Sequence, residues 1–377
     1  MTKLTAGANI ALNTDEFNVS GLLTGTYSNT SSTGFDVDVG QGYGEHYAGS
    51  SLTFSGGALH SGTITGLSET YLGADVFSMT DLNLDAATFV QWVNSGNSAA
   101  ASAAIFAGDD TLIGSSDDDV LDGMIGHDVI RGGAGADVII GGDGNDHLYG
   151  QSSNGGPDGA DSIVGGDGTD YLQGNAGNDT LDGGGTHDRI NGGANDDLIF
   201  GGGGADAING NLGNDTIHGG DGNDTARGGK DNDLIQGEAG NDTLSGDLGN
   251  DTIEGGAGVD MMTGADGTDT FRFAAGDAHL VGTATDIIAD YADGSDKIAL
   301  GFSVSAVLTG DTQTSLSAAE SYAQQLLDGH AGNGEVAAVH VGSDTYLFFA
   351  GDGGATVDSA IDLKAAATSA FDTSDFV

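Results

Sequence analysis

A nine-residue repeat constrains the fold of this chain more than any other feature. The stretch GGDGNDHLY (141–149) defines its frame, G-G-x-G-x-D-x-U-x, in which U is a large apolar residue. The frame recurs 18 times, with one interruption by the six residues GQSSNG (150–155). A fixed period of this kind predicts a stack of equivalent turns rather than a mixed globular fold. The position-6 aspartates are Asp110, Asp119, Asp128, Asp137, Asp146, Asp161, Asp170, Asp179, Asp188, Asp197, Asp206, Asp215, Asp224, Asp233, Asp242, Asp251, Asp260 and Asp269.

The glycines of the frame indicate a shared backbone geometry. Position 1 is glycine in every repeat but the first, and position 4 is glycine in 14 of the 18 repeats. Three exceptions at position 4, Asp117, Asn195 and Asp231, are residue types that tolerate a left-handed conformation. Thr186 is the fourth exception, and threonine does not share this tolerance. We therefore expect its loop to be distorted or poor in metal.

The apolar position of the frame predicts short strands. Position 8 is Leu or Ile in most repeats, and only Ala226 is small there. Each nonapeptide then forms a glycine-rich turn and a strand of about three residues whose middle side chain points inward. Two nonapeptides complete one coil, so that two parallel sheets meet in a thin core. The predicted fold class is all-β, dominated by a parallel β-roll over residues 105–272.

The net charge indicates what such a roll must bind. Eight Lys and Arg residues stand against 57 Asp and Glu residues, which gives a formal net charge of −49. This balance excludes nucleic acid and an anionic membrane surface as expected partners, because both require positive charge. The thin core cannot offset the entropy of ordering 70 glycines as well as the repulsion between aspartates. We therefore predict bound cations in the turns.

Calcium is the cation that fits these turns best. It accepts about six to eight oxygen ligands in irregular geometry, whereas magnesium demands a strict octahedron. The chain has no cysteine, which excludes thiolate metal sites and disulfides. We predict that the 18 position-6 aspartates are calcium ligands, that about 15 ions bind at one per pair of adjacent loops, and that metal binding is part of the folding free energy. We predict no catalytic residue and no organic cofactor.

These repeats resemble those of the RTX (repeats-in-toxin) calcium-binding family. The resemblance implies a calcium-bound parallel β-roll, export through a type I secretion apparatus, and folding outside the cell where calcium is available. The chain has no H-E-x-x-H and no G-x-S-x-G motif, so it is similar to the roll of serralysin-type proteins without the protease domain. The N-terminal sequence does not resemble a cleaved leader, and no apolar run is long enough to cross a membrane. We expect a secreted, extracellular protein, with cell-surface association left open.

Two segments flank the repeats. Residues 1–104 predict a small β-rich domain, with strands near 50–56, 62–67 and 75–84. One helix is predicted after Asp85, which acts as its N-cap, and this helix ends at Gly96.

Residues 273–377 predict a C-terminal α+β capping and secretion segment. Residues 286–300 resemble the segment that closes the roll in serralysin-type proteins. Asp290, Asp293 and Asp296 are candidates for a further ion there, although an ordinary acidic loop is an equal alternative.

The remaining C-terminal sequence predicts a helix, a hairpin and a signal. A helix is expected over 315–329, with Ser317 and Glu320 as a capping box. A hairpin is expected over 335–353, with its turn at 342–344. The last residues, Asp-Phe-Val, are similar to a type I secretion signal.

These features favour a structural role at a cell surface, in a surface layer or in a biofilm matrix. Self-association and a cell-surface polysaccharide are both candidate partners. Outward-facing Val138, Ile140, Leu198 and Phe200 indicate either a docking surface or a face that the N-terminal domain covers. Two alternatives stay open: an extracellular enzyme with an unrecognised N-terminal domain, and a haem or ligand carrier that uses His46 in the expected loop GYGEHYAG.

Overall fold

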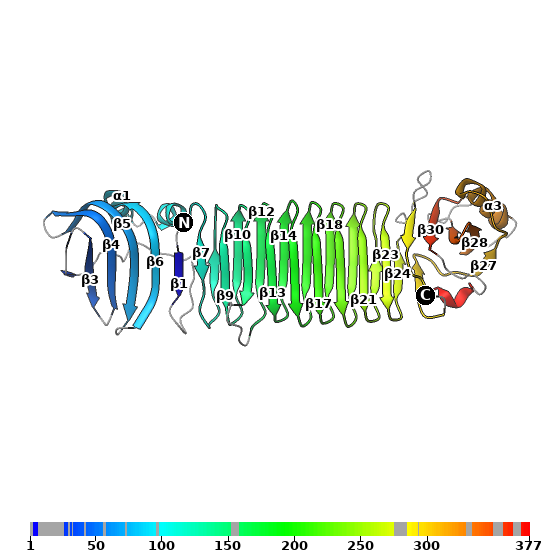
Figure 1. Ribbon diagram of the computed structural model, residues 1–377, viewed down its shortest axis with the longest axis horizontal. Helices are drawn as coiled ribbons and strands as arrows, with labels where there is room; N and C mark the ends of the chain where they lie inside the picture. Colours follow the sequence, from blue (N-terminus) through cyan, green and yellow to red (C-terminus); the bar gives the residue numbers. More distant parts are fainter. Residues whose placement is uncertain are drawn as a thin grey trace. The chain divides into compact units, whose positions relative to one another are not determined.

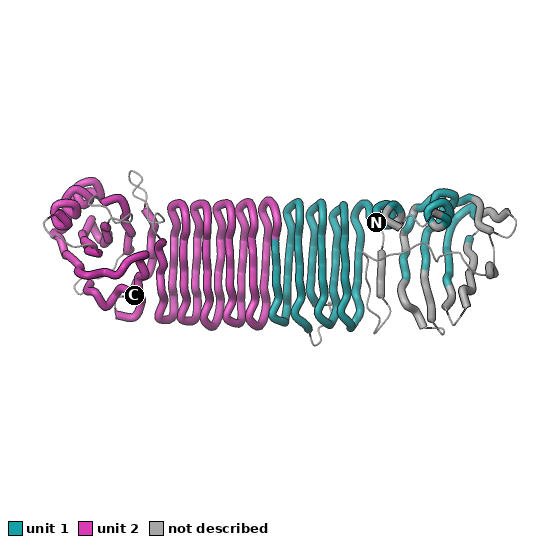
Figure 2. The backbone as a smooth tube through the Cα atoms, turned by 180° about the vertical axis from the view of Figure 1, so that it is seen from behind, with its two compact units in different colours: residues 1–182 teal, residues 183–377 magenta. Residues whose placement is uncertain are grey.

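The computed structural model describes most of the chain in two compact units, residues 1–182 and 183–377 (Figure 2). The residues described are 3–6, 26–28, 31, 33–40, 43–55, 58–71, 74–95, 98–151, 158–274, 285–292, 294–328, 334–349, 357–364 and 371–377. Among these, no helix is both long and apolar enough to span a membrane. The repeats form a parallel β-solenoid of about nine turns, which confirms the predicted fold class.

The first unit begins with an antiparallel meander. Neighbours in the order β2, β3, β4, β5, β6 and β1 are hydrogen-bonded to one another. Strand β1 also pairs in parallel with β7, so it joins the meander to the first coil of the roll. The strands are β1 (Lys3–Ala6), β2 (Thr26–Ser28), β3 (Gly34–Gly40), β4 (Tyr43–Ser55), β5 (Ala58–Tyr71), β6 (Ala74–Asp85) and β7 (Thr111–Ile113).

Two helices, rather than the single one expected, follow the meander. Helix α1 (Ala86–Ser95) begins as predicted, because the Thr88 backbone N–H donates to Asp85 Oδ2 at 2.8 Å. The ring of Phe89 packs edge-on against the buried ring of Tyr47. The second helix, α2 (Ser98–Ile105), corrects the prediction. Its sequence is mostly alanine, the residue with the highest helix propensity, although it has little amphipathic periodicity.

The coils of the first unit have the predicted two-sheet arrangement. Strands β7, β9, β11 and β13 form one sheet, and β8, β10 and β12 form the other. Position-8 residues of neighbouring strands lie side by side in register, as Ile130 pairs with Leu148 and Ile139 pairs with Ile163. The strands are β8 (Val120–Asp122), β9 (Val129–Gly133), β10 (Val138–Asp143), β11 (His147–Gln151), β12 (Ser162–Asp167), β13 (Tyr171–Ala176) and β14 (Thr180–Gly185).

The second unit continues the same pattern (Figure 1). Odd-numbered strands pair in parallel with odd ones and even with even, so Ile208 lies beside Ala226 in one sheet and Ile217 lies beside Ile235 in the other. All position-8 side chains are buried, and the two columns that they form, one from each sheet, are the core. The strands are β15 (Arg189–Ala194), β16 (Leu198–Gly203), β17 (Ala207–Leu212), β18 (Thr216–Asp221), β19 (Thr225–Lys230), β20 (Leu234–Ala239), β21 (Thr243–Leu248), β22 (Thr252–Glu254), β23 (Met261–Asp266) and β24 (Thr270–Phe273).

The interruption in the repeats lies slightly later than predicted. Gly150 and Gln151 still belong to β11, and Gln151 pairs with Gly133. They therefore occupy positions 1 and 2 of the next repeat, and the extra residues fall between Gln151 and Asp158. The coil geometry resumes at Asp158, which takes position 3 of its repeat.

The left-handed backbone extends to one more position than predicted. Thr186 has φ 79°, close to the 83° of Asn195, so the expected distortion of its loop is wrong. Asp117, in contrast, is not among the described residues with positive φ. Position 2 is also left-handed, even where Met124 (φ 69°) or Glu238 (φ 71°) occupies it. The surrounding coil therefore imposes a conformation that these side chains disfavour.

The C-terminal segment adds one more coil and a capping sheet. Strand β25 (Asp286–Ile288) pairs in parallel with β23, and β26 (Lys297–Leu300) pairs in parallel with β24. Strand β30 (Ser359–Leu363) then links β25 to a sheet with β29 (Asp344–Phe349), β28 (Glu335–Val341) and β27 (Ala306–Thr309). The predicted hairpin is confirmed, since Val341 pairs with Asp344 across its turn.

The predicted helix is α3 (Leu316–Asp328), but its cap differs from the prediction. The Ala318 backbone N–H donates to the Ser315 hydroxyl at 3.2 Å, so Ser315 and not Ser317 caps the helix. Ser317 lies inside the first turn, where its carbonyl accepts from the Ser321 hydroxyl.

Candidate metal centre

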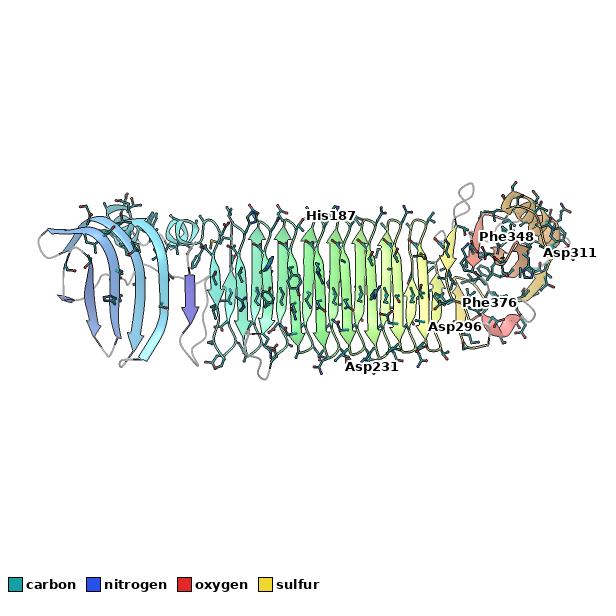
Figure 3. All side chains as sticks on the ribbon, viewed as in Figure 1. His187, Asp231, Asp296, Asp311, Phe348 and Phe376 are labelled. Atoms are coloured by element: carbon teal, nitrogen blue, oxygen red, sulfur yellow. The ribbon has the colours of Figure 1, made fainter. Side chains whose placement is uncertain are left out.

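The position-6 aspartates form two columns, one at each edge of the coils. Aspartates that precede odd-numbered strands stack along one edge, and those that precede even-numbered strands stack along the other. Figure 3 illustrates this for the second unit, where His187, in a turn before β15, and Asp231, in a turn before β20, lie at opposite edges. Each of the 18 aspartates is at most 3% exposed.

A hydrogen-bond ladder fixes one oxygen of most carboxylates in the columns. The backbone N–H of an aspartate donates to Oδ1 of the aspartate one coil further along, as Asp206 does to Asp224 at 2.8 Å. Equivalent bonds of 2.7–3.2 Å run along both columns in each unit. The side chain of one coil therefore orders the backbone of the coil before it.

Glycine at position 1 leaves room for the second oxygen. A Cβ atom on Gly123 would lie 2.3 Å from Asp128 Oδ2 and 2.7 Å from the Gly141 carbonyl oxygen. Any side chain at this position would displace the carboxylate. The near-invariance of glycine at position 1 is thus a requirement of the site rather than of the turn alone.

The second oxygen is where a cation fits. In eleven repeats within the described ranges, Oδ2 is fully buried and has no hydrogen-bond partner. A buried carboxylate oxygen without a partner is destabilising unless a cation or a proton neutralises it. Carboxylate and backbone carbonyl oxygens are the donor set that calcium prefers. The eleven are Asp128, Asp137, Asp146, Asp161, Asp206, Asp215, Asp224, Asp233, Asp242, Asp251 and Asp269.

The electrostatics of the columns agree with this need. Burial raises the pKa of Asp242 to about 7 and that of Asp233 to about 8, from an ordinary value of 3.8. Neighbouring carboxylates of the same column raise both pKa values further, and the backbone N–H bond lowers them. Without a bound cation, ionised columns of this kind disfavour the folded state.

Any metal site here combines few side chains with main-chain oxygens. Within the described part of the chain, no three His, Asp or Glu side chains gather closely enough to hold an ion. Turn carbonyls of successive coils are closely stacked, and a Cβ on Gly142 would lie 2.1 Å from the Met124 carbonyl oxygen. The donors available are therefore column carboxylates and turn carbonyls.

The columns extend beyond the last repeat to two residues that the nine-residue frame misses. Asp286 Oδ1 accepts from the Asp260 N–H at 2.9 Å, and Asp296 Oδ1 accepts from the Asp269 N–H at 3.2 Å. The spacing from the preceding aspartates is irregular, which hid them. Each nonetheless keeps the local pattern Asp-x-Ile, which could have revealed them.

The trio predicted for a further ion is only partly brought together. Asp290 accepts from the Gly264 and Ala265 backbone N–H groups, so it caps the previous coil. Asp296 Oδ2 accepts from the Ala292 N–H at 2.8 Å. Asp293 lies outside the described residues. A further ion held by these three aspartates stays a prediction.

A second ladder, at position 5, was not predicted. Here the side chain accepts from the backbone N–H one coil later, as Asn232 Oδ1 does from Asn250 at 2.8 Å. In the first unit, His127 Nδ1 takes the same role for Asn145. The position-5 ladder runs in the opposite sense to the aspartate ladder, so adjacent turns are joined in both directions.

The loop expected for haem binding is a strand. His46 and Tyr47 both lie in β4, and neighbouring side chains on a strand point to opposite faces. Tyr47 is buried and donates to Glu45 Oε2 at 2.6 Å, whereas His46 is exposed. The two residues therefore do not converge on one ligand.

The parallel solenoid and its two carboxylate columns define a class of protein whose turns are suited to calcium. A family model described as RTX calcium-binding nonapeptide repeat (4 copies) matches residues 106–139, 122–155, 156–190, 182–217, 218–253 and 240–271. Residues 106–271 are therefore RTX calcium-binding nonapeptide repeats.

Two solved structures from Azotobacter vinelandii show similarity. The AlgE6R3 subunit of its mannuronan C5-epimerase is 28% identical, with a TM-score of 0.29, and the match covers 42% of this chain and 78% of that one. The AlgE6R2 subunit is 23% identical, with a TM-score of 0.28, and the match covers 40% and 88%. A search of curated proteins found no match.

Proposed function

We propose that this is a secreted calcium-binding RTX protein that folds outside the cell on binding Ca²⁺ and serves as a structural component of a cell surface, surface layer or biofilm matrix. The observation that carries the proposal is the set of eleven buried Oδ2 atoms without partners. They explain why the fold requires calcium. Export through the type I secretion apparatus, directed by the C-terminal residues, belongs to the same proposal.

In this proposal the 18 position-6 aspartates hold Ca²⁺ together with the turn carbonyls. Oδ1 of most of these aspartates is already engaged by backbone, as in the bond from the Asp215 N–H to Asp233 at 2.8 Å. Oδ2 is then the oxygen available to the ion, except in Asp119, where it accepts from the Ser115 N–H. When bound, the ions supply positive charge between carboxylates of successive coils, and the protein supplies their order and spacing.

A polysaccharide is the partner that one outer face favours. On β9, β11 and β13 of the first unit, Arg131 lies 5.0 Å over the Tyr149 ring, and the Tyr149 and Tyr171 ring centroids are 5.8 Å apart. The Tyr171 hydroxyl donates to Gln173 Oε1 at 3.0 Å. None of the outward positions on these three described strands is acidic. Aromatic rings, amides and a guanidinium on an acid-free surface suit the apolar faces and hydroxyls of sugars.

The experiment that tests the proposal is light scattering on chelator-stripped protein during calcium titration. We expect the radius to shrink at constant mass, followed by growth if the protein assembles with itself. A radius that does not respond to calcium would overturn the proposal. Binding of Tyr149→Ala and wild-type protein to surface polysaccharide, at saturating calcium, then tests the partner.

A further inference from the structure

One aspartate outside the position-6 columns is only partly buried as a residue, but both oxygens of its carboxylate are fully buried. Asp158 occupies position 3 of its repeat, directly after the interruption. Both of its carboxylate oxygens are fully buried, and the backbone N–H groups of Ala176 and Gly159 lower its pKa. The other position-3 aspartates, Asp143, Asp167, Asp221 and Asp266, are all exposed. The burial of Asp158 is thus a property of this one turn and not of the repeat.

The surroundings of Asp158 include carboxylates, a carbonyl and the backbone N–H groups of Ala176 and Gly159. It lies beside the column in which the Asp137 N–H donates to Asp161 Oδ1 and the Asp161 N–H donates to Asp179 Oδ1, each at 2.9 Å. Asp161 is 2% exposed, and its Oδ2 is buried without a partner. A Cβ on Gly159, the next residue, would lie 2.2 Å from the Gly135 carbonyl oxygen.

Charge interactions couple Asp158 to the carboxylates of the column. Burial is the largest cause that raises the pKa of Asp158 to about 6, and Asp179 raises it further. Asp158 in turn contributes to the raised pKa of Asp137, about 7, and of Asp161, about 8. The turn therefore concentrates negative charge.

We propose that Asp158 is a calcium ligand that the nonapeptide pattern does not contain, and that it supplies a second carboxylate to the ion held beside Asp161. A second carboxylate raises calcium affinity, because affinity in oxygen sites depends on ligand charge. This site is accordingly the tightest of the first unit and is occupied before its neighbours. The inference rests on the proposed calcium-dependent folding and assigns an order to it.

The test compares Asp158→Asn with Asp167→Asn, which removes the same charge from the exposed position 3 of the following repeat. Full-length chelator-stripped protein is titrated with calcium, and hydrogen exchange of residues 158–182 is followed by mass spectrometry. We expect Asp158→Asn to raise the calcium midpoint for protection of this segment by about tenfold. Asp167→Asn is expected to leave it unchanged.

Two outcomes would overturn the inference. In one, both variants have the wild-type midpoint. In the other, Asp158→Asn becomes protected at lower calcium than wild type, which shows that Asp158 merely repels its neighbours. Wild-type protein that gains no protection from calcium would instead refute the proposed function itself. Bound calcium per chain, measured at saturation, separates a lost site from a variant that fails to fold.

Discussion

Two parts of the second unit bury their side chains in different ways. The segment around α3 and the β28–β29 hairpin has an apolar cluster in which Ala319, Val339 and Phe348 are fully buried. The coils from β15 to β24 bury one apolar side chain and one carboxylate per repeat, such as Ile217 and Asp215. Burial stabilises the first arrangement directly. In the second arrangement, burial of the carboxylate is unfavourable unless a cation or a proton neutralises it. Burial therefore stabilises the apolar cluster but opposes folding of the ionised coils.

Calcium removal should have the largest effect and should separate the two parts. We expect the amides of residues 183–274 to lose protection from hydrogen exchange in chelator, while those of α3 and β28 retain more. Each ion contributes about 2.7 kcal/mol when calcium is at about 100 times its Kd, and many ions act together. Equal loss of protection in both parts would show that the cluster around α3 does not stand without the coils.

Acidification should partly replace calcium in the coils. The pKa of Asp215 is raised to about 6 and that of Asp233 to about 8, mainly by burial. These groups take up protons on folding, so their contribution is fully present below their ordinary pKa of 3.8 and is lost as the pH rises through 6 to 8. In chelator, we expect the radius to shrink as the pH falls from about 8 to about 5. An unchanged radius over this range would contradict the electrostatic account.

A methyl group at position 1 should damage a coil more than one at position 3 of the preceding repeat. A Cβ on Gly210 would lie 2.2 Å from Asp215 Oδ2, whereas a Cβ on Gly203 would meet nothing within 4 Å. At saturating calcium, we expect Gly210→Ala to lower the free energy of unfolding by more than about 2 kcal/mol and Gly203→Ala to change it by less than about 0.5 kcal/mol. Denaturant titration measures both. Equal changes in the free energy of unfolding for the two variants would show that the carboxylate does not require glycine at position 1.

The position-5 ladder should give the smallest effect. Asn232 Oδ1 accepts from the backbone N–H and the side-chain amide of Asn250, at 2.8 and 3.1 Å. We expect Asn232→Ala to lower the free energy of unfolding by about 0.5–1.5 kcal/mol at saturating calcium. The reciprocal variant, Ala205→Asn, is expected to raise it slightly. If Asn232→Ala lowers the free energy of unfolding as much as Gly210→Ala does, the position-5 ladder contributes as much to stability as the carboxylate column.

The regular part of the fold could be predicted because the same pattern, and so the same local geometry, recurs in every repeat. A frame of nine residues places every position-6 aspartate in a column and every position-8 side chain in the core. The prediction weakened where the frame breaks. Asp286 and Asp296 continue the columns at irregular spacing, and Asp158, directly after the interruption, has a buried carboxylate that the frame does not predict.

Other differences arose where local chemistry offers two equivalent choices. Ser315 and Ser317 are both acceptable N-caps by residue type, and the bond from the Ala318 N–H identifies Ser315 as the cap. The left-handed conformation at position 2 was hidden because residues such as Met124 do not favour it. Tertiary context overrides residue preference at such sites. The role of the aspartates as calcium ligands stays a prediction from the pattern.

A ladder of nearly identical coils has a degeneracy problem. A shift of the register by one full coil again places aspartate beside aspartate and leucine beside isoleucine. The buried contacts alone therefore do not distinguish the correct register from a shifted one. The side chains on the outer faces are not interchangeable. Phe200 stacks on His218, and Glu254 pairs with Arg272. These irregular pairs form only when the coils are in the correct register. The outer faces therefore favour one register among several that would bury the same groups in the core.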